Sequence, residues 1–131
     1  RVFGGDQYRP NIHIEDVTDL YVKLLELPDE KIAGKIWNAG WENQTINEIA
    51  GIVRDNVDRP GVEIAKEPTN DHRSYRISSE KIKRDIGFVP RHSIAEAVAD
   101  LVREFRAGNI PDSMTNPKYF NIKTMQAISL R

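Results

Sequence analysis

The sequence predicts one α/β domain with more helix than strand, and three observations support this fold class. Apolar residues recur at helical spacing in four segments, which begin near positions 15, 46, 79 and 94. Thr45 and Ser93 are each followed three residues later by glutamate, the pattern of a helix-capping box. Short apolar runs at 12–14, 35–40 and 62–65 lie between these segments and predict short strands.

The expected helices end at residues that stop a helix. The first runs over 15–27, with carboxylates near its start, and Pro28 ends it. The second covers 45–56. The third covers 79–86, and the fourth begins at Ser93 and ends near Gly108.

The remaining stretches predict irregular structure. Residues 1–11 are rich in Gly, Asp, Asn and Pro and read as a loop. Gly87 is placed to take a left-handed conformation after the third helix. Residues 110–131 predict a loosely packed tail, in which a few apolar side chains dock.

Composition excludes several classes of protein. Hydrophobic residues make up 39% and charged residues 30%, which is an ordinary globular balance. The 19 basic and 20 acidic residues are interspersed, so no strong positive field is available and nucleic acid is not an expected partner. No apolar run is long enough to span a bilayer, so no membrane partner is expected. A chain without cysteine fits a cytoplasmic location.

Several motifs of catalysis and cofactor binding are missing from these 131 residues. There is no Gly-x-Gly-x-x-Gly after a strand, no P-loop and no Gly-x-Ser-x-Gly. His13, His72 and His92 are far apart in the sequence and have no cysteine near them, so no metal site is expected. The sequence therefore predicts no catalytic residue in this chain.

Two arginines in expected loops are the main candidates for ligand contact. Arg9 precedes Pro10, and Arg73 lies in a polar loop before the third helix. A planar guanidinium presents paired donors that match phosphate oxygens, although exposed surface charge is the plainer interpretation of both. The weaker candidates lie beside these arginines or in the 35–40 run, and they are Tyr8, Asn38, Asp71 and Arg76.

Four segments in order resemble the extended short-chain dehydrogenases that act on nucleotide sugars, such as UDP-glucose 4-epimerase-like enzymes. Residues 9–17 resemble the family's Arg-x-x-x-His-Val-x-Asp-Val segment, and 35–40 resemble its Tyr-Asn-Val/Leu-Gly strand. Residues 45–50 resemble its Ser/Thr-x-x-Glu-Leu/Ile-Ala helix. Residues 71–90 resemble its Asp-x-Arg … Lys … Leu-Gly-Phe/Trp-x-Pro run. The resemblance covers residues 4 to about 106.

This resemblance implies that residues 1–131 are the C-terminal substrate-binding lobe of an NAD-dependent nucleotide-sugar epimerase/dehydratase of the Rossmann superfamily. The main Rossmann sheet is then absent from the chain. The intact enzyme would bind NAD or NADP through a glycine-rich loop and use a Tyr-x-x-x-Lys pair for acid–base chemistry. Neither element occurs here, so the fragment is expected to hold no cofactor and to be inactive alone. Arg9 and Arg73 would hold the nucleotide diphosphate.

The expected partners are a nucleotide-sugar and the missing N-terminal Rossmann domain. An unpaired strand at 35–40 also predicts self-association, because an exposed strand edge pairs readily with another chain. Epimerisation and dehydration both remain open. The competing interpretation is a small noncatalytic protein-interaction domain, which affinity for a nucleotide-sugar would distinguish from the first.

Overall fold

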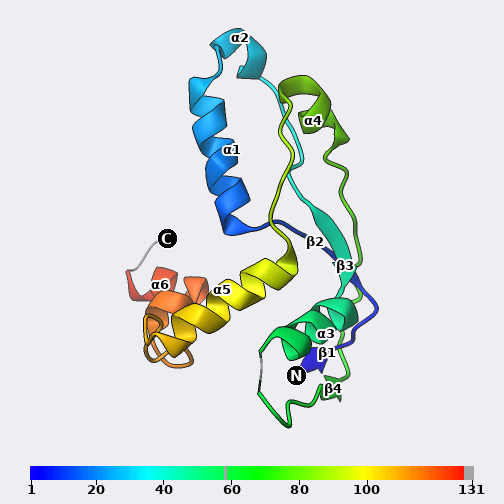
Figure 1. Ribbon diagram of the computed structural model, residues 1–131, viewed down its shortest axis with the longest axis vertical. Helices are drawn as coiled ribbons and strands as arrows, with labels where there is room; N and C mark the ends of the chain where they lie inside the picture. Colours follow the sequence, from blue (N-terminus) through cyan, green and yellow to red (C-terminus); the bar gives the residue numbers. More distant parts are fainter. Residues whose placement is uncertain (58, 129–131) are drawn as a thin grey trace. The chain divides into compact units, whose positions relative to one another are not determined.

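The computed structural model describes residues 1–57 and 59–128 (Figure 1). The chain divides into two compact units, Arg1–Ala99 and Asp100–Arg131. Helix α5 (Ile94–Arg106) runs from the first unit into the second. No helix in the described ranges combines the length and apolar character needed to cross a bilayer.

The first unit contains two small sheets of two strands each. Strand β1 (Val2–Phe3) pairs in parallel with β4 (Lys66–Glu67). Strand β2 (Tyr8–Asn11) pairs antiparallel with β3 (Glu42–Thr45), and the two lie side by side in Figure 1. No larger sheet is present in the described part of the chain, so the expected α/β fold with little strand is confirmed.

The helices of the first unit begin and end close to the predicted positions. Helix α1 spans Ile14–Glu26, and a short α2 (Asp29–Ile32) follows it. Helix α3 spans Ile46–Asn56 and has the predicted capping box of Thr45. Helix α4 spans Glu80–Ile86 and ends at Gly87, whose φ of 68° is the expected left-handed conformation. The second capping box is also confirmed, with Ser93 N–H donating to Glu96 Oε2 at 2.6 Å.

The strand predicted at 35–40 is wrong. Among the described residues this segment has no strand partner, and side chains of the α4 region bind it instead. Lys81 Nζ donates to the Ile36 carbonyl at 2.8 Å, and the Trp37 indole donates to Asp85 Oδ2 at 2.9 Å. The Gly40 N–H donates to Ser79 Oγ at 2.9 Å. Self-association through 35–40 was expected because an unpaired strand edge binds other chains. Residues 35–40 do not form such an edge.

The other strand predictions are shifted along the chain. Residues 1–11 contain β1 and β2 and are not a loop, while 12–14 lead directly into α1. The pairing expected at 62–65 occurs at Lys66–Glu67, where β4 meets β1. Strand formation depends on a partner distant in sequence, and local propensity does not identify that partner.

A small hydrophobic core joins α1 to α4. Leu20, Ile82 and Phe88 are buried, and Trp37 and Leu24 pack against them. Fully burying side chains of this size stabilises by roughly 1.5–3 kcal/mol each. This core fixes the segment that follows α4 against α1, and it thereby sets the position of the residues around His92.

The second unit is short and helical. A 3₁₀ turn η1 (Pro117–Tyr119) is followed by α6 (Asn121–Ala127). The Asn116 side chain accepts from the Lys118 N–H at 3.1 Å, and Thr124 Oγ1 donates to the Pro117 carbonyl at 2.7 Å. The docking expected of the tail's apolar residues is not seen for Ile122, which is largely exposed. Residues 129–131 of the predicted tail lie outside the described residues.

Candidate functional site

Arg9 and Arg73 meet on one carboxylate, although 64 residues separate them. Arg73 binds Asp71 with two donors, Nε to Oδ1 at 2.7 Å and Nη2 to Oδ2 at 2.7 Å. Arg9 Nη2 reaches Oδ2 of the same side chain at 3.4 Å. We call Arg9, Asp71 and Arg73 the arginine cluster. The fold thus places both predicted guanidinium groups at one location.

Backbone pairing explains how the loop carrying Arg73 is laid against β2. The Tyr8 N–H donates to Ser74 Oγ at 3.0 Å, and the Tyr75 N–H donates to the Tyr8 carbonyl at 3.4 Å. Asp71 shapes the loop itself, because its Oδ1 accepts from the Arg73 N–H at 3.1 Å, as in an Asx turn. The loop is thus bound to β2 at residues 74–75 and is shaped internally by Asp71. Together these bonds place Arg73 near Arg9.

The two arginines differ in how much of each is committed within the protein. The Arg9 side chain is 24% exposed, and it also donates to the carbonyls of Tyr8 and Arg73. These bonds and the Asp71 contact use three of its five N–H groups. The Arg73 side chain is 82% exposed and donates twice, both times to Asp71. Arg73 therefore has more donor capacity left for a ligand.

Aromatic rings flank the cluster and bring in two of the weaker candidates. The Arg76 guanidinium lies over the Tyr8 ring, 3.6 Å from its centroid. The Arg9 guanidinium lies 5.7 Å from the Tyr75 centroid. Asn38 is exposed in the unpaired 35–40 segment, and within the described residues no hydrogen bond links it to the cluster. The structure thus groups Tyr8, Asp71 and Arg76 with the arginines and leaves Asn38 apart.

The charge of this group favours an anion. The hydrogen bond from the Arg73 side chain lowers the pKa of Asp71, and the Arg73 N–H and the charge of Arg9 act in the same direction. Asp71 is therefore ionised at neutral pH. Three arginines and one carboxylate leave a net charge of about +2 for Arg9, Arg73, Arg76 and Asp71 together.

An open hollow of about 540 Å³ lies beside the cluster, within the size range of small-molecule sites. Its walls include Asp6, Asp71, His72 and the Gly4–Gly5 turn, while Arg9 and Arg73 are not among the described residues that line it. At Gly5 (φ 136°) a Cβ would lie 2.3 Å from the Asn47 side chain, so only glycine fits this turn. Gln44, paired with Arg9 across the β2–β3 ladder, has a buried Oε1 with no hydrogen-bond partner among the described residues.

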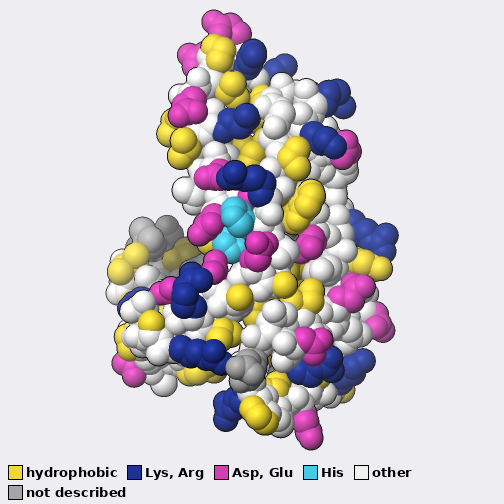
Figure 2. Space-filling model, viewed as in Figure 1, with side chains coloured by type: hydrophobic (Ala, Val, Ile, Leu, Met, Phe, Trp, Pro, Cys, Tyr) yellow, Lys and Arg dark blue, Asp and Glu magenta, His cyan; other side chains and the backbone are white. Residues whose placement is uncertain are grey.

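Sequence reasoning missed a second polar cluster at the start of α1. Asp16 is 1% exposed and accepts from the N–H groups of Arg91 and His92 at 2.9 and 3.0 Å. His92 Nδ1 lies 3.0 Å from Asp16 Oδ1, and the rings of His13 and His92 have centroids 5.0 Å apart. We call His13, Asp16 and His92 the histidine cluster. On the face drawn in Figure 2, histidine atoms (cyan) lie among acidic and basic side chains.

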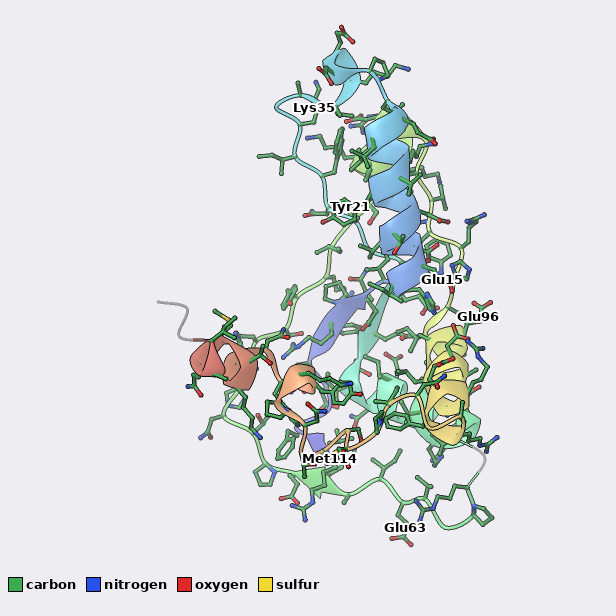
Figure 3. The ribbon with its side chains drawn as sticks, turned by 90° about the vertical axis from the view of Figure 1, so that its left-hand side faces the viewer. Glu15, Tyr21, Lys35, Glu63, Glu96 and Met114 are labelled. Carbon is green, nitrogen blue, oxygen red and sulfur yellow. The ribbon has the colours of Figure 1, made fainter. Side chains whose placement is uncertain are left out.

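The titration behaviour of the histidine cluster follows from its bonds. Burial raises the pKa of Asp16, but the hydrogen bonds from Arg91 and His92 outweigh it and leave this pKa below its ordinary value. The hydrogen bond to Asp16 raises the pKa of His92, with Glu15 and Glu96 contributing. Figure 3 shows Glu15 and Glu96 at the starts of α1 and α5. The 79-residue gap between the two histidines hid this cluster from the sequence.

Solved structures with a similar fold include L-threonine dehydrogenases. A partial-consensus L-threonine 3-dehydrogenase matches with a TM-score of 0.68 and 23% identity over 81% of this chain. The GalE-like L-threonine dehydrogenase from Cupriavidus necator, in its holo form, gives 0.67 and 23% over 79%. RMD from Pseudomonas aeruginosa complexed with NADPH gives 0.67 and 21% over 81%.

These likenesses concern part of a larger fold. The chain spans 36%, 35% and 34% of the lengths of those three proteins, about one third in each case. No family model matches the sequence, and no curated protein matches it. The chain therefore has the fold of about one third of each of these three proteins, at low sequence identity. The contacts predicted for Arg9 and Arg73 with a ligand stay predictions.

Proposed function

We propose that this chain is the substrate-binding part of an NAD(P)-dependent nucleotide-sugar epimerase or dehydratase, and that it binds the diphosphate of a nucleotide-sugar. The observation that carries the proposal is the arginine cluster, in which two guanidinium groups from distant segments share Asp71. The fold shared with dehydrogenases supports the class of enzyme.

The two arginines have different roles in this proposal. Arg73 supplies exposed donors for phosphate oxygens, while Arg9 holds the loop and adds positive charge. Hydrogen bonds to charged groups contribute about 1.5–3 kcal/mol each, so two from Arg73 are enough for a measurable affinity. Binding the diphosphate at a distance from the reacting carbon would position the sugar for chemistry elsewhere in the enzyme.

NAD(P) would be bound outside this chain. The described residues form two sheets of two strands each, and their only parallel pairing is the two-residue contact of β1 with β4. Dinucleotide binding in this superfamily uses an open, mostly parallel sheet with a Gly-x-Gly-x-x-Gly turn before a helix. We therefore assign these residues no contact with the cofactor and no step of hydride transfer. The chain's own contribution is to bind and orient the substrate.

Isothermal titration calorimetry of the chain tests the proposal with the diphosphates of uridine, thymidine, guanosine and cytidine. At least one should bind, and its parent nucleoside should not. Arg73→Ala should weaken binding about tenfold or more, the equivalent of one lost charged hydrogen bond. Arg54→Ala is the matched control, because Arg54 is also exposed and also pairs with an aspartate, Asp55, at 2.7 Å.

Equal affinity of the Arg73→Ala variant and the unaltered chain would contradict the proposal. Equal losses in the Arg54→Ala and Arg73→Ala variants would also contradict it, because they would indicate general attraction of anions. Far-ultraviolet circular dichroism of each variant confirms that the compared proteins are folded.

A further inference from the structure

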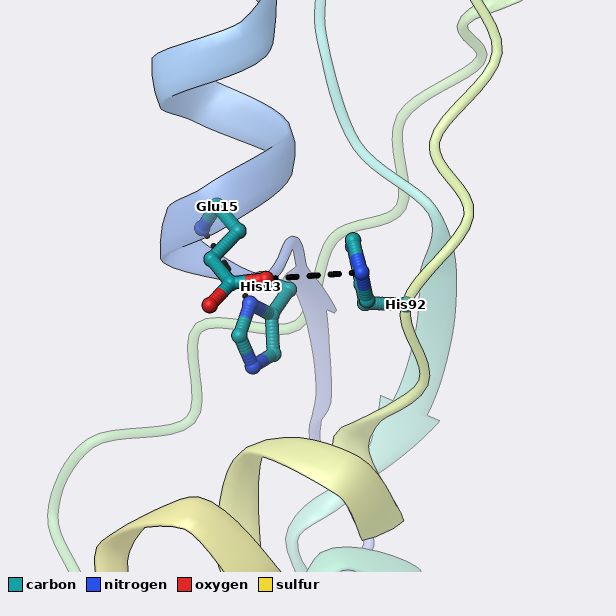
Figure 4. A group of neighbouring side chains, drawn as sticks. All are labelled: His13, Glu15 and His92. Carbon is teal, nitrogen blue, oxygen red and sulfur yellow. Dashed lines mark hydrogen bonds and ion pairs between the residues drawn. The ribbon is translucent and has the colours of Figure 1, made fainter.

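We propose that His13, Glu15 and His92 form a binding site for one divalent transition-metal ion of the Zn²⁺ type, separate from the arginine cluster. One nitrogen from each histidine and one carboxylate oxygen of Glu15 all lie within 4.8 Å of one another (Figure 4). Imidazole nitrogen and carboxylate oxygen are ordinary ligands of such ions. The wide spacing in sequence argued against a metal site, and the fold removes that argument.

His92 is already oriented as a metal ligand would be. Asp16 is an ionised acceptor, so the short contact between its Oδ1 and His92 Nδ1 places the ring proton on Nδ1. The lone pair of a neutral His92 is then on Nε2, which lies 3.5 Å from Glu15 Oε2. A carboxylate that holds the far nitrogen of a histidine is the usual support of a metal-binding imidazole.

The Nδ1 atom of His13 also has a lone pair, which accepts a hydrogen bond in the metal-free chain. Its Nδ1 accepts the Glu15 N–H at 3.1 Å as the N-cap of α1, so this nitrogen carries no proton. A metal ion that takes this lone pair replaces one capping bond. His13 is buried and Glu15 is exposed. The site would therefore combine one ligand that packing holds in place with one ligand that can move.

The distances require a small closing movement. Metal–ligand bonds of about 2.0–2.2 Å in a tetrahedron place the ligand atoms roughly 3.3 Å apart. The Glu15 side chain is exposed on the first turn of α1 and can rotate toward an ion, and the two imidazole rings would have to approach each other as well. The fourth position would be open to water.

The surrounding charge favours a cation. Asp16 contacts His92, and the hydrogen bonds from Ser93, followed by the charges of His92 and His13, lower the pKa of Glu96. The Arg91 side chain is paired with Asp19. These carboxylates give the location a negative potential that the sequence, with its net charge near zero, does not show.

Titration of the metal-free chain with Zn²⁺ and with Co²⁺ tests the proposal, at about pH 7.5 because protons compete for imidazole. We expect one ion per chain by calorimetry and visible Co²⁺ absorption typical of a nitrogen-containing site of low coordination number. His92→Gln should lower the affinity at least tenfold, and Glu15→Gln should lower it severalfold. His72→Gln, which alters an exposed histidine of another loop, should leave binding unchanged.

Three results would overturn the proposal. They are no saturable binding, binding that survives both His92→Gln and Glu15→Gln, and binding that His72→Gln weakens equally. Glu15→Gln changes an exposed side chain, so it remains informative if His92→Gln fails to fold. Circular dichroism of each metal-free variant identifies such a failure. Because these residues are not in the arginine cluster, failure here leaves the nucleotide-binding proposal unaffected.

Discussion

The arginine cluster and the histidine cluster use the same construction in two different environments. In each, one aspartate binds a cationic or titratable side chain from a segment more than 60 residues away. Asp71 lies near the surface and binds exposed guanidinium, whereas Asp16 is buried and accepts two backbone N–H groups. The buried carboxylate therefore holds backbone groups of the fold, whereas the exposed one leaves the Arg73 side chain largely open to solvent.

The largest effect should come from removing the buried carboxylate. Asp16→Ala leaves the Arg91 and His92 N–H groups without their acceptor, and we expect a loss of about 3 kcal/mol in the free energy of unfolding. Urea denaturation measures it. Asp19→Ala, on the same helix, removes an exposed ion pair and should cost no more than about 1 kcal/mol. Equal losses of stability in the two variants would contradict the larger structural role given to the buried Asp16.

Within the arginine cluster, the less exposed Arg9 should contribute more to stability than the exposed Arg73. Arg9→Ala removes donors to the Tyr8 and Arg73 carbonyls and should lower the free energy of unfolding by about 1.5 kcal/mol. Arg73→Ala should cost less than Arg9→Ala, because the Arg73 side chain is exposed and solvent screens its ion pair with Asp71. The same urea experiment tests both. A larger loss for Arg73→Ala would contradict the assignment of Arg9 as the arginine that holds the loop.

The smallest effect concerns pH. The pKa of Asp71 is lowered in the folded chain, so its contribution to stability is complete above the ordinary value of 3.8 and is lost as pH falls through the lower folded pKa. The stability gap between the unaltered chain and Asp71→Asn should therefore shrink as pH falls below 3.8. Urea denaturation at a series of pH values follows it. If this difference in stability stays constant across that range, the negative charge of Asp71 does not stabilise the folded chain through its contacts with the arginines.

The sequence predicts most of the helices, because their signals are local. Thr45 with Glu48 and Ser93 with Glu96 mark two starts, and Gly87 marks an end. The strands were less predictable. Lys35–Gly40 looks like a strand, but side chains of the α4 region take its backbone groups, while the polar run Glu42–Thr45 forms β3 because β2 lies opposite.

The arginine cluster could be predicted in part from the sequence, whereas the histidine cluster could not. Arg9 and Arg73 belong to sequence patterns that pointed to a shared pocket, and the fold brings both to Asp71. His13 and His92 belong to no common pattern, and the core of Leu20, Ile82 and Phe88 is what brings their segments together. Such packing is decided by the whole unit, so residue spacing does not reveal it.

Arginine side-chain NMR during titration with a nucleoside diphosphate shows whether the arginine cluster binds the diphosphate. We expect the Nε–H signals of Arg9 and Arg73 to shift together and to saturate at one ligand concentration, with the larger shift at Arg73. The Nε–H of Arg54, which pairs with Asp55 on α3, should not move. Saturable binding that leaves the Arg9 and Arg73 signals in place would contradict the account.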